Sequence, residues 1–470
     1  AGRRQLILYH MEEMKMVESA MKKKLNIRPL VGFLQHSAFW EGPCRAGKFE
    51  NLQPEAEKVW ADNYMKEIRE KVKEIIPQVN VLEPIAVPYI ENLTVPQETW
   101  DKIEEGLDQV DAFVIFCYRI PKLEKYRKTT IVFSNGNEGA DLCAYNRSIG
   151  VEAYNAIDME DLNDILHSLW VRKCIANTKA LILTSGQVPT YGIQSNIRDV
   201  EYLRKQYGFE VLKLPFKDIF PYMDRVDEGE AKQIAEKLLA DSKDTKVNPE
   251  WLVNDAKYYL AAKAMMDFYG CNAFSTACIE LCASRIPQER KFTPCVCHSL
   301  LKSEGIPSAC EEDLNAMMAM MVLMYGSHKA AFMGNPFLQS PEILSIHHAV
   351  PALKMNGFDK PDLDYSMWAF TGQGFGGKMQ IAFEQNDEQY ITFGRFNPMG
   401  NKMVVKVGEV VRSEFRQYYC SPHYFIKLDN GRDYMHTLAD FGHHQVLVFG
   451  DQLALVKKIA GYMGFEVVEG

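Results

Sequence analysis

Three acidic residues, Glu311, Glu312 and Asp313, stand in a row directly before a long apolar segment. Ser308 and Glu311 fit the S-x-x-E capping box at the start of a helix, and acids in a first helical turn complement the helix dipole. A carboxylate held at such a place also stays ionised, as a metal ligand or a general base requires. The capping box explains one acid but not three, so the pattern leaves a helix cap and a chemical site equally open.

The eleven histidines are spread thinly except for two adjacent pairs, His347-His348 and His443-His444. Imidazole is the usual protein ligand of a borderline divalent ion, and carboxylates complete such a mixed nitrogen and oxygen site. Both pairs stand on or beside β-like runs, where neighbouring side chains point to opposite faces. We therefore expect only one histidine of each pair to face a common site. Hydrogen-bonded histidines at strand ends would explain either pair alone, but two pairs together with the acidic cluster favour a metal.

The bulk composition limits the classes of function. A chain of 470 residues is too long for one core, so two or three domains are expected. The net charge of −9 argues against nucleic acid or an anionic membrane as the main partner. The eleven cysteines lie mostly in apolar runs without a CxxC, which favours reduced, buried thiols. Because no signal-peptide core or membrane-spanning run is visible, we expect a cytoplasmic protein.

One further motif, GQGFGGK at 372–378, has the spelling of a phosphate-binding loop. A phosphate cradle needs a helix N-terminus and a magnesium-binding hydroxyl. Here Met379 stands in place of Ser or Thr, and the residues that follow have the pattern of a strand. We interpret this run as a glycine-rich turn.

The alternation of elements predicts the fold class. From about residue 30 to 160, apolar runs such as PLVGFL, AFVIFC and TTIVFS are typical of buried parallel strands separated by helices. A second βαβ series begins near 179 with KALILTSG. After roughly residue 365, apolar and polar residues alternate around turn signals such as Asn430-Gly431, which indicates antiparallel strands. The sequence therefore predicts an α/β protein with open parallel sheets followed by an antiparallel β domain.

Three segments carry a resemblance to a known family. NIRPLVGF near the start, SACEEDLNAMMAMMVLMYG at 308–326 and the closing FGHHQVLVFGDQLALVKKIAGYMGFEVV are similar to segments of the L-fucose/L-arabinose isomerase superfamily. The resemblance implies two Rossmann-like α/β domains, at 1–165 and 166–345, and a C-terminal antiparallel β-barrel-like domain at 346–470. The site would lie between the second and third domains and would be completed by a neighbouring subunit of a homotrimer or homohexamer.

The resemblance also implies a metal site. Glu311 matches the family's glutamate that binds a divalent ion, usually Mn2+ with Mg2+ or Co2+ as alternatives, and that works as an acid/base. The family's second carboxylate falls on Asn335, whose amide oxygen can coordinate a metal but cannot take a proton. The nitrogen ligands match His347, with His348 as the fallback, and His444 of the C-terminal pair.

Because Asn335 stands where the family has its second carboxylate, the implied site has one carboxylate fewer than the family's site. Glu311 could act alone as the proton shuttle, or the partner could be Glu312, Asp313 or Glu280. A substrate that carries its own negative charge would also suit a less anionic site, and it would require Lys or Arg nearby.

Four further residues are expected to contact the substrate: Glu280, His348, His443 and Trp40. Trp40 stands with His36 in QHSAFWEG, and both would reach a substrate across a subunit interface. Ordinary packing explains these two residues equally well.

These features predict a divalent-metal-dependent isomerase of a small-molecule sugar, which interconverts an aldose and a ketose through a cis-enediol. Glu311 would be both metal ligand and acid/base. One alternative is a sugar-binding or regulatory protein that kept the fold and lost the chemistry, and Asn335 favours it. Another is a sugar epimerase or a sugar-acid isomerase on the same scaffold.

Overall fold

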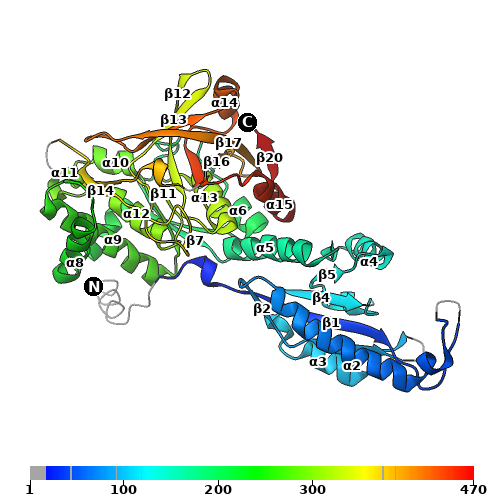
Figure 1. The fold of residues 1–470 in the computed structure, drawn as a ribbon. Helices are drawn as coiled ribbons and strands as arrows, with labels where there is room; N and C mark the ends of the chain where they lie inside the picture. Colours follow the sequence, from blue (N-terminus) through cyan, green and yellow to red (C-terminus); the bar gives the residue numbers. More distant parts are fainter. Residues whose placement is uncertain (1–16, 43–44, 91–92, 118, 373–374, 387) are drawn as a thin grey trace. The chain divides into compact units, whose positions relative to one another are not determined.

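The computed structural model describes residues 17–42, 45–90, 93–117, 119–372, 375–386 and 388–470, and the chain divides into two compact units (Figure 1). The first unit is Lys23–Trp170, close to the predicted domain 1–165. The second unit is Val171–Gly470 with the described residues up to Lys22. The predicted boundary between 345 and 346 falls inside strand β13 (Ile343–His347), so the structure joins the second and third predicted domains in one unit.

A parallel sheet forms the first unit, as the βαβ rhythm predicts. Its strand order is β2-β1-β4-β5-β6, and β3 also pairs with β1. The strands are β1 (Leu25–Leu34), β2 (Val79–Val81), β3 (Ile85–Tyr89), β4 (Ala112–Cys117), β5 (Thr129–Phe133) and β6 (Ala153–Ala156). The helices are α2 (Pro54–Lys71), α3 (Gln97–Glu104), α4 (Asn137–Ser148) and the first part of α5 (Met159–Ala176), which ends in the second unit. The strands read as continuous apolar runs because both faces of the sheet are covered.

The second unit contains a parallel sheet with the order β11-β10-β7-β8. Its strands are β7 (Lys179–Thr184), β8 (Glu210–Pro215), β10 (Ala273–Thr276) and β11 (Ser308–Cys310). The helices of this region are α6 (Val200–Tyr207), α7 (Phe220–Met223), α8 (Glu228–Ala240), α9 (Pro249–Tyr269), α10 (Cys278–Ala283), α11 (Ile286–Arg290), α12 (Cys295–Ser303) and α13 (Leu314–Ser327). Open sheets of this kind carry their sites at the carboxyl ends of the strands, and the acidic segment directly follows β11.

The C-terminal part of the second unit is antiparallel and barrel-like, as the sequence predicts. Strands follow one another in the order β16-β19-β12-β13-β18-β17, and pairing of β16 with β17 closes the ring. β20 is added to β17 in parallel. These strands are β12 (Phe332–Ser340), β13 (Ile343–His347), β16 (Tyr390–Phe396), β17 (Lys402–Glu414), β18 (His423–Lys427), β19 (Gln445–Phe449) and β20 (Glu466–Glu469), with helices α14 (Gly431–Thr437) and α15 (Leu453–Met463).

A small sheet of β9 (Thr245–Lys246), β14 (Ser366–Ala369) and β15 (Gly377–Gln380) lies in the same unit. The glycine-rich run at 372–378 leads into β15 and not into a helix. The strand after this run agrees with the interpretation as a glycine-rich turn. A phosphate-binding loop would need the start of a helix at this place.

Helix α13 explains why the two halves of the second unit form one body. Its residues Leu314–Gly326 are all buried, and the helix packs against β11 of the parallel sheet and against β16 and β19 of the barrel. A helix that is apolar on every side needs cover on every side, so neither half is a complete core alone. Among the described residues, no helix combines the length and the apolar character needed to cross a membrane.

Candidate metal centre

The acidic segment forms a turn between β11 and α13, and the backbone conformation of this turn sets the directions of its three carboxylates. Glu311 and Glu312 both adopt left-handed backbone conformations, with φ of 62° and 63°. Two such residues in succession cost roughly 1–3 kcal/mol each, a strain that is typical of functional sites. Asp313 is the N-cap of α13, and its side chain accepts the Ala316 N–H at 2.9 Å.

The capping box predicted for Ser308 and Glu311 is therefore wrong. Ser308 lies in strand β11, where its hydroxyl is 2.8 Å from Nδ1 of His298. The helix begins later than the S-x-x-E spelling suggests because the strand runs to Cys310 and a turn follows it. The acidic segment thus supplies both a helix cap and a group that faces the histidines. Asp313 is the cap, and Glu311 is the group that faces the histidines.

Glu311 stands at the centre of a group of nitrogen donors. One carboxylate oxygen, Oε1, lies 3.5 Å from Nε2 of His348, and Oε2 lies 3.8 Å from Nε2 of His444. Donor atoms of Glu311, His443 and His444 all lie within 4.8 Å of one another, as do those of Cys310, Glu311 and His348. Burial opposes ionisation of Glu311, but His444 and His348 outweigh it and lower the pKa of this carboxyl to about 2.

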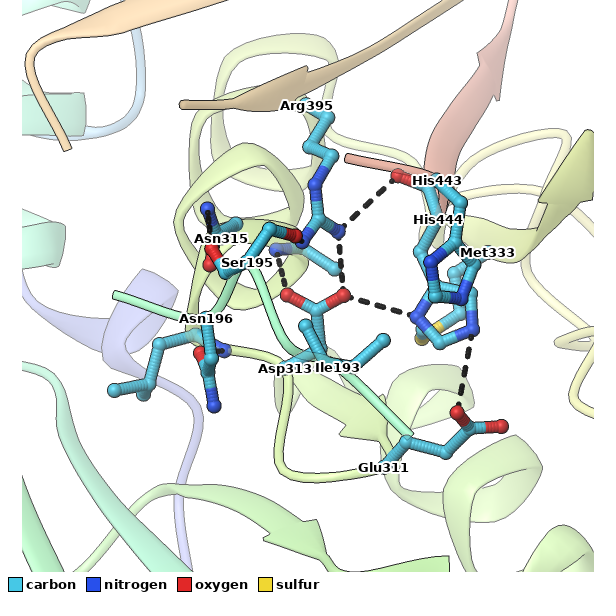
Figure 2. A network of polar contacts seen from close by, with 12 residues as sticks. Ile193, Ser195, Asn196, Glu311, Asp313, Asn315, Met333, Arg395, His443 and His444 are labelled. Atoms are coloured by element: carbon cyan, nitrogen blue, oxygen red, sulfur yellow. Dashed lines mark hydrogen bonds and ion pairs between the residues drawn. The ribbon is translucent and has the colours of Figure 1, made fainter. Parts of the chain in front are cut away.

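His444 is held in one orientation by buried charges (Figure 2). Its Nδ1 is 2.9 Å from Oδ2 of Asp313, and the same oxygen accepts from Arg395 at 2.5 Å. All three side chains are fully buried. Because a carboxylate only accepts, the Nδ1 of His444 carries a proton, and in the neutral form of the ring the lone pair is on Nε2, toward Glu311. Burial acts to raise the pKa of Asp313, but Arg395 and then His444 hold it below its usual range.

Arg395 is itself fixed from several sides. Its Nε donates to the Phe441 carbonyl at 2.7 Å, and its Nη2 donates to the Ser195 hydroxyl at 3.3 Å. Arg395 is not among the site residues predicted from the sequence. The available signal was a charged side chain inside the apolar run of β16, because a charge on a buried strand must have a partner.

Two asparagine side chains connect the loop after β7 to the acidic turn through hydrogen bonds (Figure 2). Asn196 donates to the Glu312 carbonyl at 2.7 Å and accepts the Leu314 N–H at 3.0 Å. Asn315 accepts the Ile197 N–H at 2.9 Å and donates to the carbonyls of Ser195 and Phe396. These side chains connect the parallel sheet, α13 and the barrel around the site. No spacing along the chain indicates these long-range hydrogen bonds in advance.

In the first histidine pair, the two side chains point in different directions, as alternation along a strand requires. His348, the fallback, faces Glu311, and its Nδ1 accepts the Ala349 N–H at 3.0 Å. His347, the preferred ligand, instead stacks on His423, its partner across β13 and β18, with ring centroids 4.3 Å apart. Burial lowers the pKa of His348, so its ring is neutral at neutral pH.

For the second pair, the expectation that only one histidine faces the site is wrong. The rings of His443 and His444 lie 4.4 Å apart, and both offer nitrogen atoms to the group around Glu311. The pair precedes β19 and is not part of it, and Gly442 before it has φ of 99°. Alternation therefore does not apply here.

The remaining predicted acids and the amide have other surroundings. Asn335 lies directly opposite His347 in the register of β12 and β13, and its role as a ligand stays a prediction. Glu312 is almost fully buried and lies 3.4 Å from Lys213, while burial raises its pKa. Glu280 accepts the Tyr191 N–H at 2.7 Å. Lys213 is the basic group that an anionic substrate would require, but Glu312 is its partner here.

Trp40 belongs to the first unit and takes part in a separate cluster. Its ring stacks on His36 with centroids 4.9 Å apart. The Nδ1 of His36 lies 2.8 Å from Oε1 of the buried Glu57, which also pairs with Arg45. Trp40 therefore has a packing role within its own unit, and a substrate contact stays a prediction.

A divalent ion fits the donor set of the second unit. Two imidazoles and one carboxylate are a common set for divalent transition metals, and they leave positions open for substrate. The Nε2 atoms of His348 and His444 are buried and have no hydrogen-bond partner among the described residues. Such atoms point to a ligand or water at the same place. No family model and no curated protein matches the chain.

Proposed function

We propose that the chain is a divalent-metal-dependent isomerase that interconverts an aldose and a ketose. The observation that carries this proposal is the buried ring of His444, whose Nδ1 is bonded to Asp313 and whose Nε2 lies 3.8 Å from Oε2 of Glu311. A carboxylate that orients a histidine through its far nitrogen is the usual support of a metal-binding imidazole. The L-fucose/L-arabinose isomerase resemblance of the acidic and GHH segments supplies the reaction.

Glu311, His443 and His444 would hold the ion, which we propose to be Mn2+, with Mg2+ or Co2+ as alternatives. When bound, the ion supplies charge stabilisation for the carbonyl and hydroxyl oxygens of the sugar. Glu311, ionised at neutral pH, accepts the proton from one substrate carbon and returns it to the neighbouring carbon, through a cis-enediol. Asp313 and Arg395 keep His444 in place and exclude water, because both are fully buried.

One observation favours a second function. Asn335 cannot take a proton, so a sugar-binding or regulatory protein would retain the donor set without the proton transfer. Exchange of carbon-bound hydrogen separates the two functions. An isomerase or an epimerase exchanges it with deuterium from the solvent, and a binding protein does not. A product that differs from its substrate at one stereocentre would identify an epimerase.

The assembly proposed with this function is a homotrimer or homohexamer of a cytoplasmic protein. Exposed aromatic side chains on the first unit support self-association, since Phe39, Trp40, Phe49 and Trp60 are 42%, 38%, 64% and 46% exposed. Exposed aromatic residues in such number are typical of surfaces that are covered in an assembly. Light scattering coupled to size-exclusion chromatography measures the state directly.

Calorimetric titration of chelator-stripped protein with manganese tests the metal site. We expect binding by the wild type and loss of at least tenfold in affinity for Glu311→Gln and His444→Ala. His436→Ala, an exposed histidine on α14, is the control and should bind as the wild type does. Equal binding by all four proteins would refute the site. Metal-loaded protein is then incubated with a panel of aldoses and ketoses in deuterium oxide, and product and exchange are followed by NMR.

A further inference from the structure

Two histidines face the same carboxylate with opposite hydrogen-bonding character. His444 gives its Nδ1–H to Asp313 at 2.9 Å, so in the neutral form of the ring its Nε2, toward Glu311, is an acceptor. His348 uses its Nδ1 as an acceptor for the Ala349 N–H at 3.0 Å. A neutral imidazole has one donor and one acceptor nitrogen, so the proton of His348 is on Nε2. The partners of the other ring nitrogen decide both assignments.

The Nε2–H of His348 is therefore directed at Oε1 of Glu311 across 3.5 Å, at a place where the His348 side chain is only 3% exposed. That separation exceeds a normal N–H···O hydrogen bond, and Nε2 has no partner among the described residues. A buried N–H in this state is available to an oxygen of a bound molecule. It cannot coordinate a cation, because the nitrogen lone pair is absent on that side.

The two oxygens of Glu311 consequently have different neighbours. Oε2 faces the lone pair of His444, and these two atoms together suit a cation. Oε1 faces an N–H, which suits an oxygen that carries negative charge. Cys310, Glu311 and His348 form one of the two groups with metal-binding spacing, but the tautomer of His348 removes its nitrogen from the donors of that group.

We propose that His348 is not a metal ligand but a neutral hydrogen-bond donor, which stabilises the substrate oxygen on which negative charge develops. This inference rests on the proposed isomerase function, because only enolisation of an α-hydroxycarbonyl compound places charge on that oxygen. His348 gives a hydrogen bond and keeps its proton throughout. The proton that moves between the two carbons of the sugar is carried by Glu311, and the hydroxyl proton passes directly between the two neighbouring oxygens of the enediolate. A fixed donor of this kind works because it needs no reorientation as the charge forms.

Two substitutions at His348 separate a donor from a ligand. His348→Gln places an amide N–H near the position of Nε2, and His348→Phe removes the donor but keeps a flat ring. We expect both variants to bind manganese within about threefold of the wild type, whereas His444→Gln loses roughly 10–100-fold. With the sugar that proves to be the substrate, His348→Phe should lose about 10²–10³ in kcat with a smaller change in KM. His348→Gln should retain more of the rate.

The tautomer has a readout that does not depend on activity. Long-range proton–nitrogen NMR correlations of histidine-labelled, metal-free protein distinguish the two neutral forms, and His348→Gln and His444→Gln identify the two resonances. We expect the Nε2–H form for His348 and the Nδ1–H form for His444. His436→Phe controls for the loss of a histidine that lies outside the site, and circular dichroism checks the fold of each variant.

The possible outcomes separate the inference from the function. If His348→Phe loses manganese as His444→Gln does, or if His348 has the Nδ1–H form, the donor role is wrong and the metal-dependent isomerase stands. If the wild type binds no manganese and exchanges no carbon-bound hydrogen, the proposed function and the inference both fail. Retained manganese affinity in both His348 variants, with the rate lost only in His348→Phe, supports the inference.

Discussion

Asp313 Oδ2 lies 2.9 Å from Nδ1 of His444, although the two residues are far apart in the sequence. The same Asp313 side chain caps helix α13 by accepting the Ala316 N–H, and it forms a buried ion pair with Arg395. One carboxylate therefore starts a helix, neutralises an arginine and fixes the tautomer of a histidine. Because these three roles share one group, the geometry around Glu311 depends on the correct packing of α13 against the barrel.

Replacing Asp313 by Asn should damage stability and metal binding together. The amide leaves Arg395 as an uncompensated buried charge, and breaking a buried pair in this way costs about 3–5 kcal/mol. Loss of the orienting carboxylate should also weaken manganese binding roughly 10–100-fold. Urea unfolding and calorimetry measure the two effects. Asp429→Asn, at an exposed position, is the control. Unchanged metal affinity in folded Asp313→Asn would show that His444 needs no such support.

The strained turn gives a second prediction, which compares two substitutions of Glu312. Both Glu312→Gly and Glu312→Ala remove the contact with Lys213, but only glycine adopts φ of 63° without steric cost. The glycine variant should therefore be more stable than the alanine variant by about 1–2 kcal/mol. Urea unfolding of the two proteins gives the difference. Equal stability, or a more stable alanine variant, would mean that the turn relaxes when the side chain is lost.

Much of the fold could be predicted from local patterns in the sequence. Apolar runs such as AFVIFC identify parallel strands, and the run before Asn430 contains the antiparallel strand β18, because burial of one or both faces leaves a direct trace in the order of residues. The hairpin turn expected at Asn430-Gly431 is wrong, since Asn430 caps helix α14 and its side chain accepts the Asp433 N–H. The union of the second and third predicted domains in one unit could not be predicted. It depends on α13 being shared between two sheets, and no local pattern records which elements cover an apolar helix.

The site could be predicted only in part for a related reason. Glu311 and His444 stand in recognisable segments, but the choice of His348 over His347 depends on which face of β13 meets the acidic turn. Arg395 and Asn315 act through contacts with residues distant in the sequence. Backbone geometry also determines that His443 faces the site together with His444. Gly442, with φ of 99°, changes the direction of the chain before β19 begins.

Lys302 gives a prediction for the pH dependence of stability. It is fully buried on α12, where its amino group donates to the Val350 carbonyl, and burial lowers its pKa to about 7. In the unfolded chain the pKa is about 10.4. Between these values the unfolded chain binds one proton more, so this residue makes the protein more stable as pH rises, by about 1.4 kcal/mol per unit. The destabilising effect is complete below pH 7 and absent above the unfolded pKa.

Removal of the amino group should therefore flatten the pH dependence. Lys302→Met should lose this slope between about pH 7 and 10 relative to the wild type, as measured by urea unfolding at several pH values. Lys427→Met, at an exposed position on β18, keeps the buried amine and should retain the wild-type slope. Parallel curves for wild type and Lys302→Met would show that Lys302 is charged in the folded protein.

Metal should stabilise the second unit, because an ion that binds only the folded state raises its free energy of unfolding. At a manganese concentration one hundred times the dissociation constant, the gain is about 2.7 kcal/mol. The melting temperature of the wild type should therefore rise with manganese and fall again with a chelator, whereas that of Glu311→Gln should respond to neither. His436→Ala should behave as the wild type does. An increase of the same size in Glu311→Gln would place the ion elsewhere and would remove the basis for assigning the site to the acidic turn.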